Sequence, residues 1–247
     1  MGEKIPGLEQ LQALVDQGEN IVFFGGAGVS TESGIPDFRG QDGLYRQQWA
    51  YPPEEIISHS FFMARPEEFY RFYRQKMLWP QAKPNAAHLA LARLEEAGKL
   101  RWVITQNIDG LHQAAGSRRV LELHGSVLRN YCMDCGRQYP LEFILESQGV
   151  PRCSCGGLVR PDVVLYEEPL DQGVLRQAAE AVAEADLVMV GGTSLGVWPA
   201  AGLLDCRPGG RVALINKSPT PRDAQADLLI QAPIGRVLGS LRLGKMD

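Results

Sequence analysis

The chain has 247 residues, of which 45% are hydrophobic, and its 25 lysines and arginines against 29 aspartates and glutamates give a net charge of −4. This length and composition predict one large α/β domain, alone or with a small appendage, and exclude extensive disorder. The mild acidity argues against nucleic acid or a membrane as partner, and no apolar run approaches the ~20 residues that cross a bilayer. Because the N-terminus has no apolar signal core, a cytoplasmic protein is expected.

Short apolar runs alternate with helical patterns along the chain. Strands are predicted at residues 21–24, 102–105, 120–123, 163–166, 187–190, 212–216 and 228–230. Helices are predicted at residues 8–16, 66–78, 86–97, 175–185 and 234–243. Several strands are apolar on consecutive residues, as in strands covered on both faces. The alternation predicts an α/β fold with a Rossmann-like, doubly wound parallel sheet.

Two stretches interrupt this alternation. Residues 41–80 lack a strand pattern and are rich in aromatic residues, with a helical second half. Residues 129–157 carry four cysteines and too little apolar content for a core of their own. We therefore expect a small lobe, made of a helical insertion (41–80) and a metal-binding module (129–157). It would interrupt a discontinuous sheet domain formed by residues 1–40, 81–128 and 158–247.

A glycine-rich turn follows the first predicted strand. Gly26 and Gly28 would leave room for backbone N–H groups to approach a pyrophosphate, although a tight strand-to-helix turn needs the same glycines. Thr31 stands at the third glycine position of the dinucleotide fingerprint, and no strand ending in an acidic residue follows about 20 residues later. A conventional dehydrogenase is therefore disfavoured.

Four of the five cysteines form two close pairs. Cys132 and Cys135 are separated by two residues, and Cys153 and Cys155 by one. Four thiolates so spaced fill the corners of a tetrahedral zinc site and leave no position for water, so a structural zinc ion is predicted. A set of reduced free thiols is the alternative. The fifth, Cys206, is expected to be a structural thiol.

Six segments, in order along the chain, carry a resemblance to a known family. They are residues 26–40 (GAGVSTESGIPDFRG), 105–112 (TQNIDGLH), 123–126 (LHGS), 160–164 (RPDVV), 192–200 (GTSLGVWPA) and 215–216 (IN). Together they resemble the signatures of the sirtuins, which are NAD-dependent protein-lysine deacylases. The resemblance spans residues 20–240, roughly the whole chain.

The resemblance implies that NAD lies between the Rossmann-like domain and the small lobe, while an acyl-lysine protein or peptide enters from the opposite side. Phe38 would cover the anomeric carbon, Arg39 would supply a cation for the pyrophosphate, and Asp109 would accept from the nicotinamide carboxamide. The residues implied to bind NAD are Gly26, Ala27, Gly28, Ser30, Thr31, Phe38, Arg39, Gln106, Asn107, Ile108, Asp109, His124, Gly192, Thr193, Ser194, Asn216 and Ile234.

His124, Asn107 and Asp109 are the implied catalytic residues, with His124 as general base. The other histidines receive no catalytic role. His59 and His88 are expected to be surface or helix-packing residues without an acidic partner, and His112 is expected to be structural.

The implied reaction is deacetylation of lysine, with release of nicotinamide and transfer of the acyl group to give O-acetyl-ADP-ribose. An NAD-dependent ADP-ribosyltransferase is an alternative. A non-catalytic NAD or peptide sensor is a further alternative, which the presence of all three implied catalytic residues disfavours.

The substrate peptide would add as a strand between residues 164–168 and 195–198. Val164, Tyr166, Leu195 and Val197 are the implied contacts. Here the chain departs from the family pattern, because Glu167 stands where a glycine is usual. This change is expected to restrict the backbone beside the peptide, and its carboxylate would favour basic flanking residues.

Acyl preference depends on the helical insertion. Sirtuins that prefer succinyl- or malonyl-lysine carry Tyr-x-x-Arg there, and this chain has Tyr73 and Lys76 by ungapped placement. Lysine lacks the bidentate fork of arginine, so deacetylation is expected, with desuccinylation or demalonylation as the alternative. The same two residues could also belong to a solvated helix face.

Overall fold

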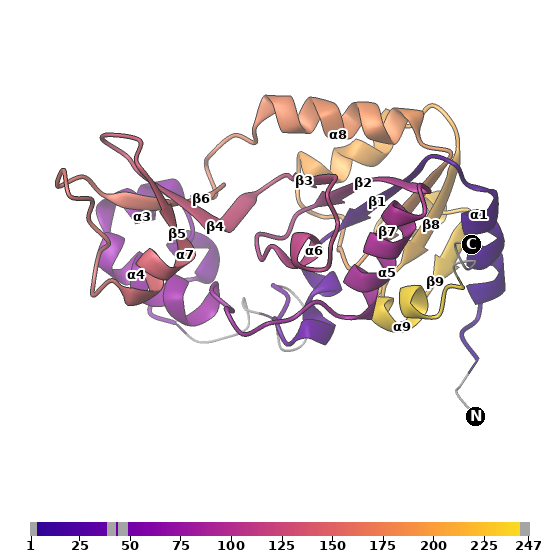
Figure 1. The fold of residues 1–247 in the computed structure, drawn as a ribbon, viewed down its shortest axis with the longest axis horizontal. Helices are drawn as coiled ribbons and strands as arrows, with labels where there is room; N and C mark the ends of the chain where they lie inside the picture. Colours follow the sequence, from indigo (N-terminus) through magenta and orange to yellow (C-terminus); the bar gives the residue numbers. More distant parts are fainter. Residues whose placement is uncertain (1–3, 39–42, 44–48, 243–247) are drawn as a thin grey trace.

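The computed structural model describes residues 4–38, 43 and 49–242 (Figure 1). Its large lobe is built on a six-stranded sheet in which every neighbouring pair is parallel. In spatial order the strands are β3 (Val120–Glu122), β2 (Leu100–Thr105), β1 (Ile21–Gly25), β7 (Leu187–Gly191), β8 (Arg211–Ile215) and β9 (Leu228–Ile230). The strand order reverses between β1 and β7, and ligands of open α/β sheets bind beyond the carboxyl ends of the strands at such a point.

Helices cover both faces of this sheet. On one face lie α1 (Leu8–Gln17), α5 (Ala86–Glu96), α6 (Leu111–Ala114) and α9 (Ile234–Gly239); on the other lie α8 (Gln172–Glu184) and the 3₁₀ helix η4 (Ala200–Cys206) (Figure 1). Shorter 3₁₀ turns are η1 (Ala27–Val29), η2 (Thr31–Ser33) and η5 (Asp223–Gln225). Each face has its own apolar core, which is why the central strands are buried along their whole length.

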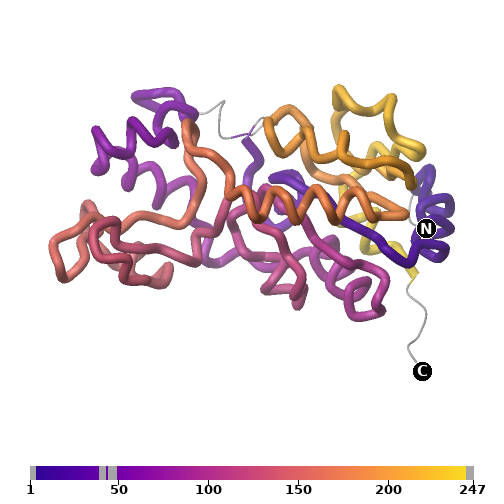
Figure 2. The backbone as a smooth tube through the Cα atoms, turned by 90° about the horizontal axis from the view of Figure 1, so that it is seen from above, coloured from indigo at the N-terminus to yellow at the C-terminus, as the bar shows by residue number. Residues whose placement is uncertain are grey.

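The small lobe combines the two interrupting segments. It contains a three-stranded antiparallel sheet and four short helices: β4 (Gly125–Cys132), β5 (Gln138–Pro140), β6 (Val159–Val163), α2 (Pro53–Ile56), α3 (His59–Ala64), α4 (Pro66–Lys76) and α7 (Leu141–Glu146). Both views place this lobe at one end of the molecule and the parallel sheet at the other (Figures 1 and 2).

One core joins the two segments of the small lobe. Aromatic residues of α3 and α4 pack with apolar residues of β6 and α7 in a single buried cluster. The Tyr70 hydroxyl donates to the Val159 carbonyl, and Arg74 Nε donates to the Ile144 carbonyl at 2.9 Å. The cysteine-bearing segment therefore shares one core with the helical insertion, in agreement with the low apolar content of the cysteine-bearing segment.

The sequence-based assignment of one strand was wrong. A strand was expected at 163–166, whereas β6 covers Val159–Val163 and pairs with β4 in the small lobe, not with the parallel sheet. The charged residues Arg160 and Asp162 hid it, because Arg160 is buried through ion pairing and not through an apolar side chain. Strands β4 and β5 and helix α7 were not expected, and α9 ends at Gly239, before the expected residue 243. No helix of the described residues has the length and apolar character of a membrane span.

Candidate active site

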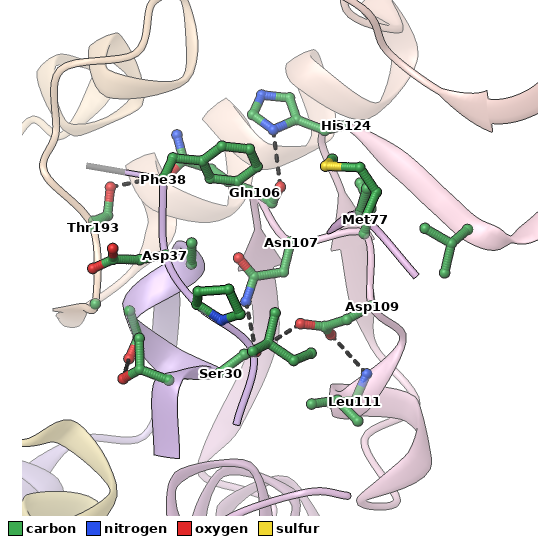
Figure 3. Close-up of a pocket in the computed structure, with 18 of the residues that line it drawn as sticks. Ser30, Asp37, Phe38, Met77, Gln106, Asn107, Asp109, Leu111, His124 and Thr193 are labelled. Atoms are coloured by element: carbon green, nitrogen blue, oxygen red, sulfur yellow. Dashed lines mark hydrogen bonds between the residues drawn. The ribbon is translucent and has the colours of Figure 1, made fainter. Parts of the chain in front are cut away.

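A cavity of 1310 Å³ lies between the lobes, beyond the carboxyl ends of β1, β2, β7 and β8 (Figure 3). Eighteen of the residues implied to bind NAD or substrate line it: Ala27, Gly28, Ser30, Thr31, Phe38, Gln106, Asn107, Ile108, Asp109, His124, Val164, Tyr166, Gly192, Thr193, Ser194, Val197, Asn216 and Ile234. Gly26 and Leu195 do not line it, and Leu195 is buried in a core of the large lobe. Arg39 falls outside the described residues.

The turn after β1 approaches the turn after β7 very closely. The N–H of Gly28 donates to the carbonyl of Gly192 at 2.7 Å. A Cβ atom on Gly28 would lie 2.8 Å from the Gly192 backbone, so no side chain fits at this point. The two glycine turns therefore meet at the cavity wall with no side chain between them, and the Gly28 N–H is already bonded to Gly192.

Three polar side chains form a directed chain of hydrogen bonds on the cavity wall (Figure 3). Asn107 Nδ2 donates to Ser30 Oγ at 3.0 Å, and Ser30 Oγ donates to Asp109 Oδ2 at 2.6 Å. The other carboxylate oxygen, Oδ1, accepts from the Leu111 N–H at 2.9 Å. Burial raises the pKa of Asp109, and the hydrogen bonds from Ser30 and Leu111 only partly offset this. The Ser30 hydroxyl thus fixes the orientation of both the Asn107 amide and the Asp109 carboxyl.

His124 follows β3 and faces the same cavity. Its Nδ1 lies 2.9 Å from the Gln106 carbonyl oxygen. Because a carbonyl can only accept, Nδ1 carries the hydrogen and Nε2 is left as a proton acceptor. Burial lowers the pKa of the imidazole, and the bond to Gln106 opposes this only in part, so the ring is neutral near pH 7. A neutral imidazole with an available Nε2 is a competent general base.

The cavity end near β7 and β8 is held by a second polar group. Thr193 Oγ1 donates to Gln106 Oε1 at 2.9 Å and accepts from the Leu195 N–H at 3.2 Å. Asn216 Nδ2 donates to the Thr193 carbonyl at 3.3 Å. The same Gln106 whose carbonyl holds His124 therefore also anchors this end of the cavity through its side chain.

The segment expected to bind peptide is attached to the helical insertion on one edge. Ser58 and Tyr166 form a parallel bridge, in which the His59 N–H donates to the Tyr166 carbonyl and the Tyr166 N–H donates to the Ile57 carbonyl, both at 3.0 Å. Glu167 adopts a left-handed backbone conformation (φ 76°) despite its side chain. Its carboxylate is bound to Ser60, not presented freely to a basic flanking residue.

Glu168, the next residue, holds a partly buried ion pair. It accepts from Arg160 at 2.7 and 3.0 Å, from the Leu165 N–H at 2.9 Å and from His59 Nδ1 at 2.8 Å. Burial acts to raise the pKa of Glu168, but the hydrogen bonds from Arg160 and Leu165 outweigh it and lower the pKa to about 2. The expectation that His59 lacks an acidic partner was therefore wrong.

Tyr73 and Lys76 both line the cavity. Tyr73 is fully buried and stacks on Phe69 with ring centroids 5.4 Å apart, so the alternative of a solvated helix face is wrong for this residue. Lys76 places its ammonium 5.5 Å from the centroid of the Trp49 ring.

The four cysteines of the small lobe come together. All four sulfur atoms lie within 4.8 Å of one another, with 3.5 Å between Cys132 and Cys155 and 3.6 Å between Cys135 and Cys153. Tetrahedral zinc with bonds of ~2.3 Å places its sulfurs ~3.8 Å apart, so this donor set fits the ion. A Cβ on Gly157 would lie 2.7 Å from Cys132 Sγ, which shows how tightly the turns close around the site. None of the four cysteines lines the cavity, as expected of a structural metal site.

Comparison with known families identifies the chain. The model of the Sir2 family matches residues 26–199. The chain belongs to the Sir2 family. Among its sirtuin relatives is an NAD-dependent protein deacetylase of Clostridium perfringens (strain 13 / Type A), 58% identical over 95% of this chain and 98% of the relative. Another, from Thermotoga maritima, is 44% identical over 90% of this chain and 91% of the relative.

Solved Sir2 structures share the fold. A Sir2 histidine-to-alanine variant with deacetylated p53 peptide and 3′-O-acetyl ADP ribose superimposes with a TM-score of 0.87 at 42% identity, covering 94% of this chain and 95% of the other. A complex of Sir2 with p53 peptide and NAD⁺ gives a TM-score of 0.84 at 43% identity, with the same coverage. The Rossmann-like fold predicted from the sequence is thereby confirmed.

The cavity of this sirtuin also contains residues that were not singled out from the sequence. Asp37 and Met77 are two of them (Figure 3). Asp37 lies inside the first signature segment, so the motif itself could have indicated it. Met77 follows α4 in the helical insertion, and no local sequence pattern distinguishes it from a core methionine.

Proposed function

We propose that this sirtuin is an NAD-dependent protein-lysine deacetylase that transfers the acetyl group to ADP-ribose and releases nicotinamide. One observation carries the proposal: His124, neutral and with Nε2 available, faces the same cavity as the Ser30–Asn107–Asp109 group. The high identity to the Clostridium perfringens deacetylase over nearly the whole chain supports it.

NAD would bind where bare backbone and fixed polar groups meet. When bound, it supplies the nicotinamide leaving group and the ribose hydroxyls that receive the acetyl group. Gly28 and Gly192 would face its phosphates, Asp109 would accept from the nicotinamide carboxamide, and Asn216 would reach the adenosine half. Phe38 would cover the reacting face of the ribose and exclude water from it. The discontinuous domain of residues 1–40, 81–128 and 158–247, without the β4 and β6 residues that pair in the small lobe, would supply most of these contacts.

His124 would act as the general base. Its Nδ1–H is committed to the Gln106 carbonyl, which fixes the ring, and Nε2 would take the proton from a ribose hydroxyl. Asn107 and Asp109, which are linked through Ser30, would orient the nicotinamide end of NAD. In this arrangement no ionised side-chain nucleophile is required.

The acyl-lysine substrate would enter beside residues 164–168. The Tyr166 backbone is already paired with the helical insertion, so a peptide strand would add along the opposite edge of this segment. Tyr166 and Val197 line the cavity and would contact the substrate, whereas buried Leu195 would contribute only its backbone. We propose that the substrates are acyl-lysine proteins or peptides, since the mild acidity of the chain favours neither nucleic acid nor membranes as partners.

Incubation with NAD and an acetyl-lysine peptide, followed by mass analysis of the products, tests the function. Free lysine peptide and O-acetyl-ADP-ribose in equal amounts are expected. ADP-ribosylated peptide or protein as the main product would overturn the proposal. His124→Ala should lose turnover, and Glu180→Ala, an exposed change on α8 away from the cavity, serves as the control.

One observation favours a second acyl specificity. Tyr73 and Lys76 line the cavity together, and Lys76 could meet the carboxylate of a succinyl or malonyl group. The measurement is kcat/KM on acetyl and succinyl versions of one peptide. A preference for acetyl-lysine is expected, because lysine offers one point charge where a bidentate fork would bind carboxylate more strongly. Lys76→Met should leave the acetyl activity unchanged and remove any residual succinyl activity.

A further inference from the structure

Two histidines without an assigned role lie in contact behind the active site. His88 on α5 and His112 on α6 are fully buried, with ring centroids 4.8 Å apart and planes at 62°. Among the described residues, His88 Nε2 and both nitrogens of His112 have no hydrogen-bond partner. Burial of unpaired polar atoms costs free energy, so two imidazoles are an unfavourable way to fill a core. Their connections indicate what they contribute instead.

His112 fixes the turn that carries Asp109. Helix α6 begins at Leu111, whose N–H holds Asp109 Oδ1 at 2.9 Å. The next residue, His112, packs between His88 and Phe23 of β1, whose ring centroid lies 6.1 Å away. The position of α6, and with it the orientation of the Asp109 carboxyl, therefore depends on the His112 ring.

His88 fixes Asn85, whose side chain holds the turn after β1. Its Nδ1 accepts from the Asn85 N–H at 3.2 Å and closes the cap of α5, in which Asn85 Oδ1 accepts from the Ala87 N–H at 2.9 Å. This arrangement directs Asn85 Nδ2 to the Val29 carbonyl at 2.8 Å and to Ser33 Oγ at 3.0 Å. Residues 27–33, of which Ala27, Gly28, Ser30 and Thr31 line the cavity, are thus anchored through Asn85.

We propose that the His88–His112 contact is a positioning link that sets the spacing between the Asp109 turn and the 27–33 turn, and so tunes the affinity for NAD. The naming of NAD as the ligand rests on the proposed function. The two turns also meet directly, through Ser30 and Asp109 at 2.6 Å, and the histidine pair is the second support behind that bond. A displacement of either turn would misplace Ser30 relative to Asp109 without touching the peptide side of the cavity.

The charge state of the pair is compatible with this role. Burial lowers the pKa of His88 to about 4, and burial together with the charge of His88 lowers the pKa of His112 to about 3. Both rings are neutral at ordinary pH, so they pack without mutual repulsion.

Three variants separate positioning from packing. His88→Gln keeps an acceptor for the capping box but removes the ring contact. His112→Leu replaces unpaired nitrogens by an apolar side chain of similar size. Asn85→Ser keeps a side-chain oxygen to cap the Ala87 N–H and loses the Nδ2 donor to Val29 without adding a charge. Leu91→Ala, a fully buried change on the same helix, is the control for simple destabilisation.

The affinity for NAD is measured by calorimetry, and the KM for acetyl peptide and the Tm are measured alongside. The three variants should weaken NAD binding by about tenfold, with peptide KM changed less than about twofold. Leu91→Ala should lower Tm and leave NAD affinity unchanged. A packing role alone predicts that His112→Leu is at least as stable as the parent and binds NAD normally, and this result would overturn the proposal.

The same experiment keeps the two proposals apart. Calorimetry needs no turnover, so an enzyme that binds NAD without deacetylating peptide contradicts the proposed function but still tests the histidine pair. Normal deacetylation by the parent chain, combined with unaltered NAD affinity in the His88→Gln, His112→Leu and Asn85→Ser variants, contradicts the positioning role alone.

Discussion

The Glu167 carboxylate accepts two hydrogen bonds from Ser60, one from the backbone N–H at 2.8 Å and one from the hydroxyl at 2.9 Å. These residues lie far apart in the chain, and their contact ties the proposed peptide-binding segment to the start of α3. Glu167 also holds a left-handed backbone conformation that favours glycine. The side chain therefore compensates for a backbone strain that a glycine would not have.

Substitutions at this position should separate the two effects. Glu167→Ala loses both hydrogen bonds and keeps the strain, whereas Glu167→Gly loses the bonds but relieves the strain. The glycine variant is expected to be more stable than the alanine variant by about 1 kcal/mol in urea denaturation. Glu180→Ala, on the exposed side of α8, controls for loss of a surface carboxylate. Equal stabilities of the Ala and Gly variants would show that the left-handed backbone carries no strain.

The parallel sheet could be predicted because its strands are apolar on consecutive residues, as in Ile21–Phe24 and Leu187–Val190. Residues at the ends of these strands converge since the carboxyl ends of parallel strands share one edge. The antiparallel sheet of the small lobe was missed because its strands alternate irregularly and carry residues such as Arg129 and Arg160. In these strands ion pairs replace part of the apolar pattern.

The contacts between histidines and their partners could not be predicted. His59 meets Glu168, 109 residues later, through the attachment of one lobe segment to another. His88 and His112 meet because α5 and α6 pack on the same face of the sheet. Such pairs depend on the tertiary arrangement, whereas the motifs around them report only local sequence.

The pH dependence of catalysis should follow the titration of His124. Its pKa is lowered by burial, so the neutral, base-competent form persists below the pKa of ~6.5 of a free imidazole. The acid limb of kcat/KM is therefore expected to have its midpoint below pH 6.5. His124→Ala should reduce kcat by about 10²–10⁴-fold with the Tm nearly unchanged. A midpoint above pH 6.5 would show that His124 is not the titrating base.

The buried histidine pair should make the fold sensitive to acid. The pKa values of His88 and His112 in the folded state, about 4 and about 3, lie below the ~6.5 of the unfolded chain. Between these values the unfolded state binds more protons, so stability is complete above pH 6.5 and falls as the pH drops toward 4. Each ring contributes a slope of up to ~1.4 kcal/mol per pH unit in that window.

Urea denaturation between pH 4.5 and 7 measures this slope. The His88→Gln/His112→Leu double variant should show a flatter profile than the parent chain. His124, whose pKa is also lowered, titrates in both proteins and cancels in the comparison. Parallel profiles for the two proteins would mean that the pair is protonated equally in the folded and unfolded chains.

Zinc removal should disable the enzyme although none of the four cysteines lines the cavity. Cys132 and Cys153 are buried in the same core as Phe62 and Tyr70, so loss of the metal would loosen the support of α3 and α4 as well as the cysteine turns. The Glu167–Ser60 contact, which depends on α3, would loosen with them.

Metal analysis should find one zinc per chain, and chelation should abolish deacetylation while circular dichroism retains the signal of the parallel sheet. Cys206→Ser, which changes an exposed thiol on η4, should keep both zinc and activity. Full activity of a chelated, zinc-free chain would show that the small-lobe core does not depend on the metal. The packing of the cysteines in the same cluster as the aromatic residues argues against that outcome.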